Sequence, residues 1–219
     1  HAALLAFDGK PAEACDLLPA ARSQLSPRSL AAAGMGVIRN GNVSPRQFQV
    51  VLGWIEEALA IDPSNLTLRL SLAEMLALKL DYAAAEPIYR EVLKAEPENV
   101  VALNNLAWIL APRPDSADEA MRHVEKAIEI SGPTGELLDT RARIHIARGR
   151  PDRAVEDLNE AIALAPTALR WFHLSVAQSK LLQKEAAARS FKEARALGIG
   201  PRMIHPSDVP MFEALAARE

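Results

Sequence analysis

A period of about 34 residues runs along most of this 219-residue chain. Short apolar segments that end at or near proline or glycine recur as EEALAIDP, REVLKAEP, EKAIEISG, NEAIALAP and KEARALGI. One small residue can be aligned in all five: Ala58, Val92, Ala127, Ala161 and Ala194. The steps between these positions are 34, 35, 34 and 33 residues. A repeat of this length predicts one helical hairpin per period and a fold built by stacking hairpins.

A second series of small residues lies seven positions before the first. Its members are Val51, Ala85, Ala120, Ala154 and Ala187. Small side chains at both positions let two helices approach closely, as an antiparallel hairpin requires. The chain also has 40 Ala and 29 Leu but only 5% aromatic residues, a composition of packed helices rather than sheets.

The units resemble the tetratricopeptide repeat. The first helix of successive units supplies Leu72, Leu106, Ala142 and Leu174, and the second supplies Tyr89, Val124, Leu158 and Phe191. Pro63, Pro97 and Pro166 match the proline that closes a repeat of this family. The resemblance implies an all-α fold: a right-handed α-solenoid (superhelix) of tetratricopeptide-type helix-turn-helix repeats with a C-terminal capping helix. The segments 204–206 and 138–142 also resemble bacterial, planctomycete-like arrays.

The phase of the repeats predicts one solenoid over residues 1–219. The expected parts are a truncated repeat (1–26), five repeats (28–65, 66–99, 100–134, 135–167 and 168–200) and a capping helix (207–218). Ser207 or Asp208 begins that last helix. Because the chain starts at His1, inside a repeat, we expect it to be a fragment of a longer protein.

Three local patterns need interpretation. The segment 66–72 alternates with the period of a strand, but its leucines continue into an apolar run after the capping residues Ser64 and Asn65, which favours a helix. Ser116 and Glu119 have the spacing of a capping box. Gly34 and Gly36 lack the strand and lysine context of a phosphate loop and are interpreted as sites of close helix packing or bending.

Residues that could carry catalysis or bind a metal do not group. No pair of histidines has metal-site spacing, and the single cysteine, Cys15, has no base nearby and is expected to be a buried small residue. His145 is expected in the core, whereas His123 and His205 are expected at the surface or in a loop. We therefore expect no enzyme activity, no cofactor and no metal.

The charge balance, 25 basic against 28 acidic residues, gives no electrostatic reason to expect a nucleic-acid partner. Five arginines cluster between 141 and 153, either as a solvated face with internal ion pairs or as a patch for an anionic ligand. Arg141 stands where the family has leucine, so it needs a carboxylate from Asp157 or Asp139. No segment is long and apolar enough for a membrane span, and the compartment (cytoplasmic or periplasmic) and oligomeric state remain open.

In proteins of this family the first helices line a concave groove. Phasing by the small residues places these candidate partner-binding residues there: Leu70, Glu74, Asn104, Asn105, Trp108, Asp139, Arg143, Phe172 and His173. Asparagine amides suit the backbone of a peptide, and a tryptophan suits an apolar anchor. Alternatively, Trp108 packs on the neighbouring unit and the asparagines satisfy local backbone groups.

Some members of the family clamp a C-terminal carboxylate with lysine, asparagine and arginine side chains on three units. Of the corresponding positions here, Asn105 alone matches, so no such clamp is expected. The leading hypothesis is a non-catalytic scaffold that binds a peptide or partner helix in the groove. The second is a regulatory or assembly region of a larger enzyme or envelope protein, docking on its own missing domain. A structural spacer or self-associating array is the third.

Overall fold

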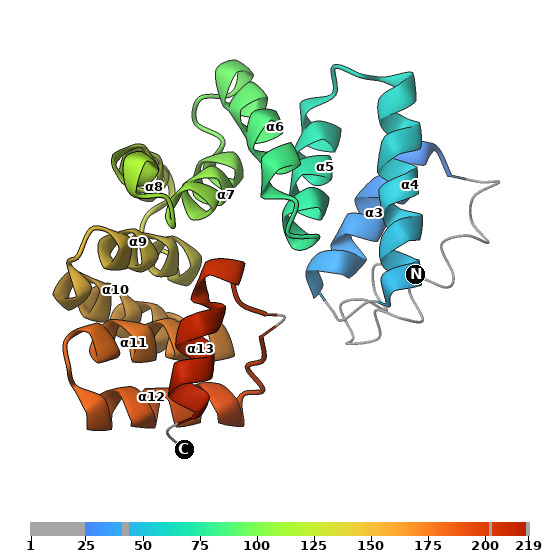
Figure 1. The fold of residues 1–219 in the computed structure, drawn as a ribbon. Coiled ribbons are helices and arrows are strands. Elements are labelled where there is room, and N and C mark those ends of the chain that lie inside the picture. The colour runs from blue at the N-terminus through green and yellow to red at the C-terminus, as the bar shows by residue number, and fades with distance from the viewer. Residues whose placement is uncertain (1–24, 41–43, 202, 218–219) are drawn as a thin grey trace. The chain divides into compact units, whose positions relative to one another are not determined.

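The computed structural model describes residues 25–40, 44–201 and 203–217, and within these ranges the chain is helical with no strand. The α-helices are α3 (Pro27–Asn40), α4 (Pro45–Ile61), α5 (Leu66–Leu78), α6 (Tyr82–Ala95), α7 (Val100–Leu110), α8 (Ala117–Ser131), α9 (Gly135–Ala147), α10 (Pro151–Leu164), α11 (Ala168–Lys180), α12 (Lys184–Ala196) and α13 (Val209–Ala216). Two short 3-10 helices, η2 (Pro114–Ser116) and η3 (Pro206–Asp208), precede α8 and α13. The all-helical array of helix pairs agrees with the repeat pattern (Figure 1).

The chain divides into two compact units, one ending at Ile88 and the other beginning at Tyr89. In the first unit α3 packs on α4, and α4 on α5. In the second unit α7 packs on α8, α9 on α10 and α11 on α12, while α8 contacts α9 and α10 contacts α11. Within the second unit each hairpin therefore packs on the next mainly through its second helix, as stacking predicts.

The small residues that define the period are the points of close helix packing. All ten are almost fully buried: Val51, Ala58, Ala85, Val92, Ala120, Ala127, Ala154, Ala161, Ala187 and Ala194. A larger side chain at any of them would have to displace a neighbouring helix. Eight of these ten positions hold alanine, so close helix packing accounts for part of the alanine content of the sequence.

The turns inside the hairpins use the left-handed region. Gly149 has φ 70°, and Leu80 and Leu182 adopt φ 64° and 61° at matching places in their hairpins. At the turn that contains Leu80, the Asp81 N–H donates to the Leu76 carbonyl and the Leu80 N–H donates to the Ala77 carbonyl. This pair of hydrogen bonds is the Schellman motif. The turn thus satisfies carbonyls that the ending helix leaves open.

Two helix-start predictions have different outcomes. Asn65 caps α5, since its side chain accepts the Leu68 N–H, and the helical interpretation of 66–72 is confirmed. The capping box at Ser116 is wrong: Ser116 has αR geometry and makes no side-chain cap bond, because η2 leads the chain directly into α8. The Glu119 carboxylate instead binds Arg90.

Gly34 confirms the close-packing interpretation of the glycines. A Cβ atom built there would lie 2.8 Å from both γ-methyl carbons of Val51, across the α3–α4 contact. At Gly36, on the same helix, nothing lies within 4 Å of a Cβ. Gly36 is therefore a suitable control for a substitution at Gly34.

We expect Gly34→Ala to lower the free energy of unfolding of the first unit by about 1–3 kcal/mol through overpacking. Gly36→Ala, the control, is expected to be neutral or to stabilise by up to about 1 kcal/mol, since alanine favours a helix. Urea denaturation followed by circular dichroism measures both. Equal effects of the two substitutions would contradict a close approach at Gly34.

The end of the chain packs on the last hairpin. Figure 1 shows α13 lying over α11 and α12. Phe212 and Leu215 of α13 join Phe172 of α11 and Phe191 of α12 in one apolar cluster. Ile204, in the segment that leads to α13, is buried in the same cluster. The C-terminal segment, residues 203–217, is therefore held against α11 and α12 by its own apolar face.

Candidate functional site

Equivalent positions of successive repeats touch one another along the first helices of the hairpins. In the first unit Arg39 of α3 makes a bidentate ion pair with Glu74 of α5, with contacts of 2.8–3.0 Å. In the second unit Trp108 of α7 contacts Arg143 of α9. These positions are 35 residues apart in both cases, one period of the sequence. Glu74, Trp108 and Arg143, three predicted site residues, thus belong to one row of the repeat.

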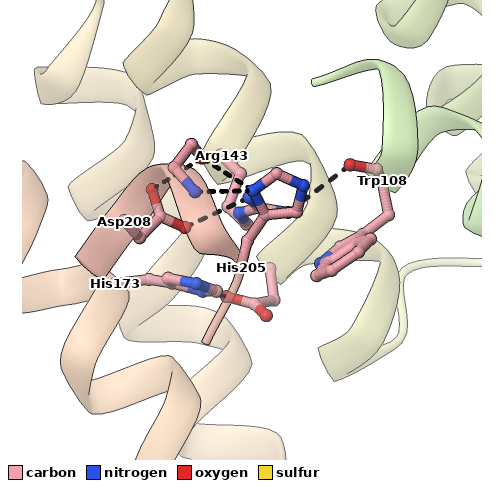
Figure 2. A network of polar contacts seen from close by, with 7 residues as sticks. Trp108, Arg143, His173, His205 and Asp208 are labelled. Atoms are coloured by element: carbon pink, nitrogen blue, oxygen red, sulfur yellow. Dashed lines mark hydrogen bonds and ion pairs between the residues drawn. The ribbon is translucent and has the colours of Figure 1, made fainter. Parts of the chain in front are cut away.

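The Trp108–Arg143 contact is the centre of the candidate site (Figure 2). The Arg143 guanidinium carbon lies 4.6 Å from the centroid of the Trp108 ring, a cation–π distance. An Arg143 N–H also reaches the Trp108 carbonyl at 3.5 Å. Arg143 is only 6% exposed, so its charge is largely removed from water and needs an anionic partner.

The C-terminal segment supplies that partner. Asp208 of η3 lies 3.2 Å from Arg143, and His205 places its ring edge-on to Trp108 with centroids 5.2 Å apart. Figure 2 shows both side chains entering the site beside Arg143. His205 lies in the loop before η3, as expected, and its side chain is half-buried there. The packing of α13 on α11 and α12 brings this loop over α7 and α9.

Burial lowers the pKa of His205 to about 4, and the positive charge of Arg143 contributes to the same shift. Asp208 opposes it, while Arg113 and His173 add to it weakly. His205 is therefore neutral at pH 7 when the C-terminal segment is docked. Its Nδ1 accepts the Ser207 N–H, which fixes the turn of the loop.

A second row of equivalent positions contains Asn104, Asp139 and His173. The Nδ1 of His173 lies 2.6 Å from Asp139 Oδ1, and both side chains are buried. The Oδ1 atom of Asn104 is buried and has no hydrogen-bond partner in the described part of the chain. Asp139 and His173 of this row lie beneath the surface and join α9 to α11.

Asn105 also serves the interior. Its amide donates to the hydroxyl of Tyr89, on the second helix of the preceding hairpin, at 3.2 Å. This bond joins two side chains, whereas the alternative expected the asparagines to satisfy local backbone groups. Trp108 does pack on the neighbouring hairpin, through Arg143, as that alternative expected.

The remaining predicted residues are placed as follows. Phe172 is fully buried between Phe191 and Phe212, so its side chain does not line an open surface as expected. The reason is α13, which covers that face of α11. Leu70 is half-buried in the first unit, on the same helix as Glu74.

A cavity of about 280 Å³ remains beside the docked segment. Its polar lining comes from Arg143, His173 and Lys180 on the repeat helices and from Ser207 and Asp208 on the C-terminal segment. Two cationic side chains thus face one carboxylate. The segment satisfies Arg143 but leaves room for a further acidic group.

Four of the five arginines in the cluster make ion pairs: Arg141, Arg143, Arg148 and Arg153. Arg141 donates to Asp157 at 2.9 Å, which confirms one of the two expected carboxylates. Arg148 binds Asp118 and Arg153 binds Glu156. The pairs support the interpretation as a solvated face with internal ion pairs.

Arg141 and Asp157 are expected to be energetically coupled. Hydrogen bonding to Asp157 raises the pKa of Arg141, and the carboxylate is nearly buried. We expect Arg141→Leu or Asp157→Ala alone to destabilise the second unit by about 1–3 kcal/mol, because either leaves a charge without its partner. The double variant should cost less than the sum of the two, as a double-mutant cycle of thermal unfolding would show. Strict additivity would contradict the coupling.

His123 and His145 lie within α8 and α9. His145 is half-buried, 3.8 Å from Asp157, and burial lowers its pKa, as it does for His123 beside Glu119. Among the described residues no group of three His, Cys, Asp or Glu side chains is placed to hold a metal ion. Cys15 and residues 1–24 of the segment expected to be a truncated repeat (1–26) lie outside the described residues. No helix in the described ranges is both long and apolar enough to cross a membrane.

Sequence reasoning missed three residues of these contacts: Arg39, His205 and Asp208. Arg39 could have been predicted from the sequence, because it precedes Glu74 by one period of the repeat. His205 and Asp208 lie after the last repeat, where the period gives no position. In the sequence, only the predicted capping helix (207–218) pointed to a docked segment there.

Comparisons with known proteins agree with this geometry. Residues 135–168, which contain α9 and α10, match the family model described as tetratricopeptide repeat. The human mitochondrial import receptor subunit TOM70 is 24% identical over 144 residues, 65% of this chain and 24% of its own length. A TPR repeat-containing protein of Pseudomonas aeruginosa, PA4667, is 30% identical over 112 residues, 51% of this chain and 19% of its own length. The chain thus spans less than a third of these curated relatives.

Solved structures show the same fold. The thermophilic TPR protein TTC0263 of Thermus thermophilus superposes with a TM-score of 0.66 at 16% identity, over 87% of this chain and 97% of that protein. MamA of Desulfovibrio magneticus gives 0.58 at 16% identity, over 78% and 92%. At this identity the likeness concerns the fold alone. Proteins built from these repeats are generally non-catalytic scaffolds for protein–protein interaction. One repeat of this chain, residues 135–168, thus matches the tetratricopeptide repeat, and the described helices form a tetratricopeptide-like array of helix pairs.

Proposed function

We propose that the second unit is a non-catalytic binding site for a partner protein, centred on Trp108 and Arg143 of the first helices α7 and α9. The observation that carries the proposal is the peptide segment already seated there: residues 205–208 contact both side chains. A surface that holds one segment of polypeptide through a ring contact and an ion pair has the chemistry to hold another.

The residue types support a protein ligand. Tryptophan and arginine are enriched among the residues that dominate binding energy in protein interfaces. Asp139 and His173 fix the hairpins against each other, and Asn105 fixes α7 against Tyr89. We assign these three a positioning role, and Trp108 and Arg143 the direct contacts. The human relative is named as an import receptor subunit, which agrees with a binding role.

The first unit extends the proposal through Glu74 and Leu70. Glu74 is 12% exposed and its charge is balanced by Arg39. Leu78, one turn further along α5, is 59% exposed. We propose that these side chains of α5 offer a further contact of mixed polarity to the same class of partner.

The second candidate is a regulatory or assembly role inside a longer protein, in which the array docks on another part of its own chain. The observation that favours it is the cis docking of residues 203–217. A partner found only as another domain of the same gene product would support this role over a separate protein partner.

The proposal predicts that Trp108→Ala and Arg143→Gln each lower the affinity for a captured partner at least about tenfold, equivalent to about 1.4 kcal/mol. Arg153→Gln is the matched control, because Arg153 is an exposed arginine in an ion pair on α10. Affinity purification with the intact chain, followed by titration of the captured protein, measures all three. Unchanged binding of both site variants would overturn the assignment.

A further inference from the structure

Residues 205–208 make two contacts with the site, one through a ring and one through a carboxylate three residues later. The His205 ring lies against Trp108, and three residues later the Asp208 carboxylate reaches Arg143. The short 3-10 turn of Pro206–Asp208 sets the distance between ring and carboxylate. Trp108 and Arg143 are themselves in contact, so together they present one flat ring and one cation at a fixed separation.

The docked segment does not fill this surface. The cavity of about 280 Å³ lies between the segment and the repeat helices, with Lys180 and Arg143 on one side and Ser207 and Asp208 on the other. A ligand with an additional carboxylate would gain an interaction with Lys180 that residues 203–217 do not supply. Shape and charge therefore both favour a more acidic occupant.

Resting on the binding surface proposed above, we infer that Trp108 and Arg143 recognise a peptide segment in which a flat ring is followed three residues later by a carboxylate. Residues 205–208 are the chain's own copy of this ligand, and an acidic partner segment with the same spacing displaces them. The C-terminal segment thus acts as a tethered competitor for the site.

A tethered competitor has a strong concentration advantage. Because it is linked to the last hairpin by a few residues, its effective concentration at the site is on the order of millimolar. A free peptide of the same sequence binds the wild-type chain weakly for this reason. A substitution that weakens the docking of residues 205–208 raises the apparent affinity of the free peptide. The gain equals the factor by which the docking equilibrium constant falls.

The experiment uses the full chain and a fluorescently labelled synthetic peptide that spans residues 203–217. The recipient is His205→Ala/Asp208→Asn, which removes both site contacts but keeps Ile204, Phe212 and Leu215 of the apolar cluster. Fluorescence anisotropy should show at least about tenfold tighter binding to this recipient than to the wild type. Adding Arg143→Gln to the recipient, or using a peptide with Asp208→Asn, should reverse the gain. The thermal unfolding of each recipient confirms that it is folded.

Equal affinity of the peptide for the wild type and the double variant would overturn the inference, as would a gain that Arg143→Gln leaves intact. Either result leaves the proposed function testable by the captured partner, because partner binding that depends on Trp108 and Arg143 does not require the peptide to bind. If partner binding did not depend on Trp108 and Arg143, by contrast, the proposed function itself would be contradicted.

Discussion

Replacing Phe212 by alanine is expected to release the C-terminal segment from the repeats. The centroid of the Phe212 ring lies 5.5 Å from that of Phe191 and 5.9 Å from that of Phe172, so Phe212 is the main apolar contact of α13. Removing a buried phenylalanine side chain costs about 3–5 kcal/mol. A helix of eight residues has no stability of its own in water, so α13 cannot remain folded once it detaches.

Hydrogen exchange of the amides in residues 209–216 measures this release, and exchange there should approach that of an unfolded chain. The same variant should change the fluorescence of Trp108, because His205 leaves its ring together with the segment. Glu213→Ala is the matched control, since Glu213 is exposed on the same helix and lies outside the apolar cluster. Slow exchange in Phe212→Ala would mean that other contacts hold the segment.

Acidification is expected to weaken the docking of the C-terminal segment. Burial beside Arg143 lowers the pKa of His205 from 6.5 to about 4 in the docked state. The released segment therefore binds more protons than the docked one between these two values. The contribution of neutral His205 to docking is fully present above pH 6.5 and is lost as the pH falls toward 4, by at most about tenfold per pH unit.

His205→Phe tests this cause directly, because phenylalanine retains a flat ring against Trp108 but does not titrate. The docked fraction, followed by hydrogen exchange corrected for the intrinsic pH effect, should fall from pH 7 to 4.5 in the wild type and fall less in the variant. Arg143, Asp208, Arg113 and His173 face the same ring, and the difference between the two chains isolates the share of His205. Identical pH profiles would contradict the role of His205.

The repeat period predicted most of the fold because it reflects a packing constraint. Two helices approach closely only where both carry small side chains, so Ala154 and Ala161 mark a hairpin contact in the sequence itself. The same phase predicted that Arg141 needs a carboxylate, and Asp157 supplies it on the paired helix. Contacts that repeat with the period are readable because the sequence shows them several times.

The candidate site was only partly readable. The phase correctly grouped Trp108 and Arg143, but it also placed Phe172 on an open surface, where the structure has α13. The contacts of His205 and Asp208 occur once, across 65 residues in the case of Arg143 and Asp208, and no periodicity announces them. Their positions depend on how an apolar face outside the repeats docks, which is a tertiary effect.

The most direct test of the account is hydrogen exchange of the intact chain with and without its captured partner. If the partner takes the site on α7 and α9, amides in residues 203–217 exchange faster in the complex, while amides around Trp108 and Arg143 are protected. Unchanged protection of residues 203–217, with new protection confined to the second helices α8 and α10, would contradict binding at this site.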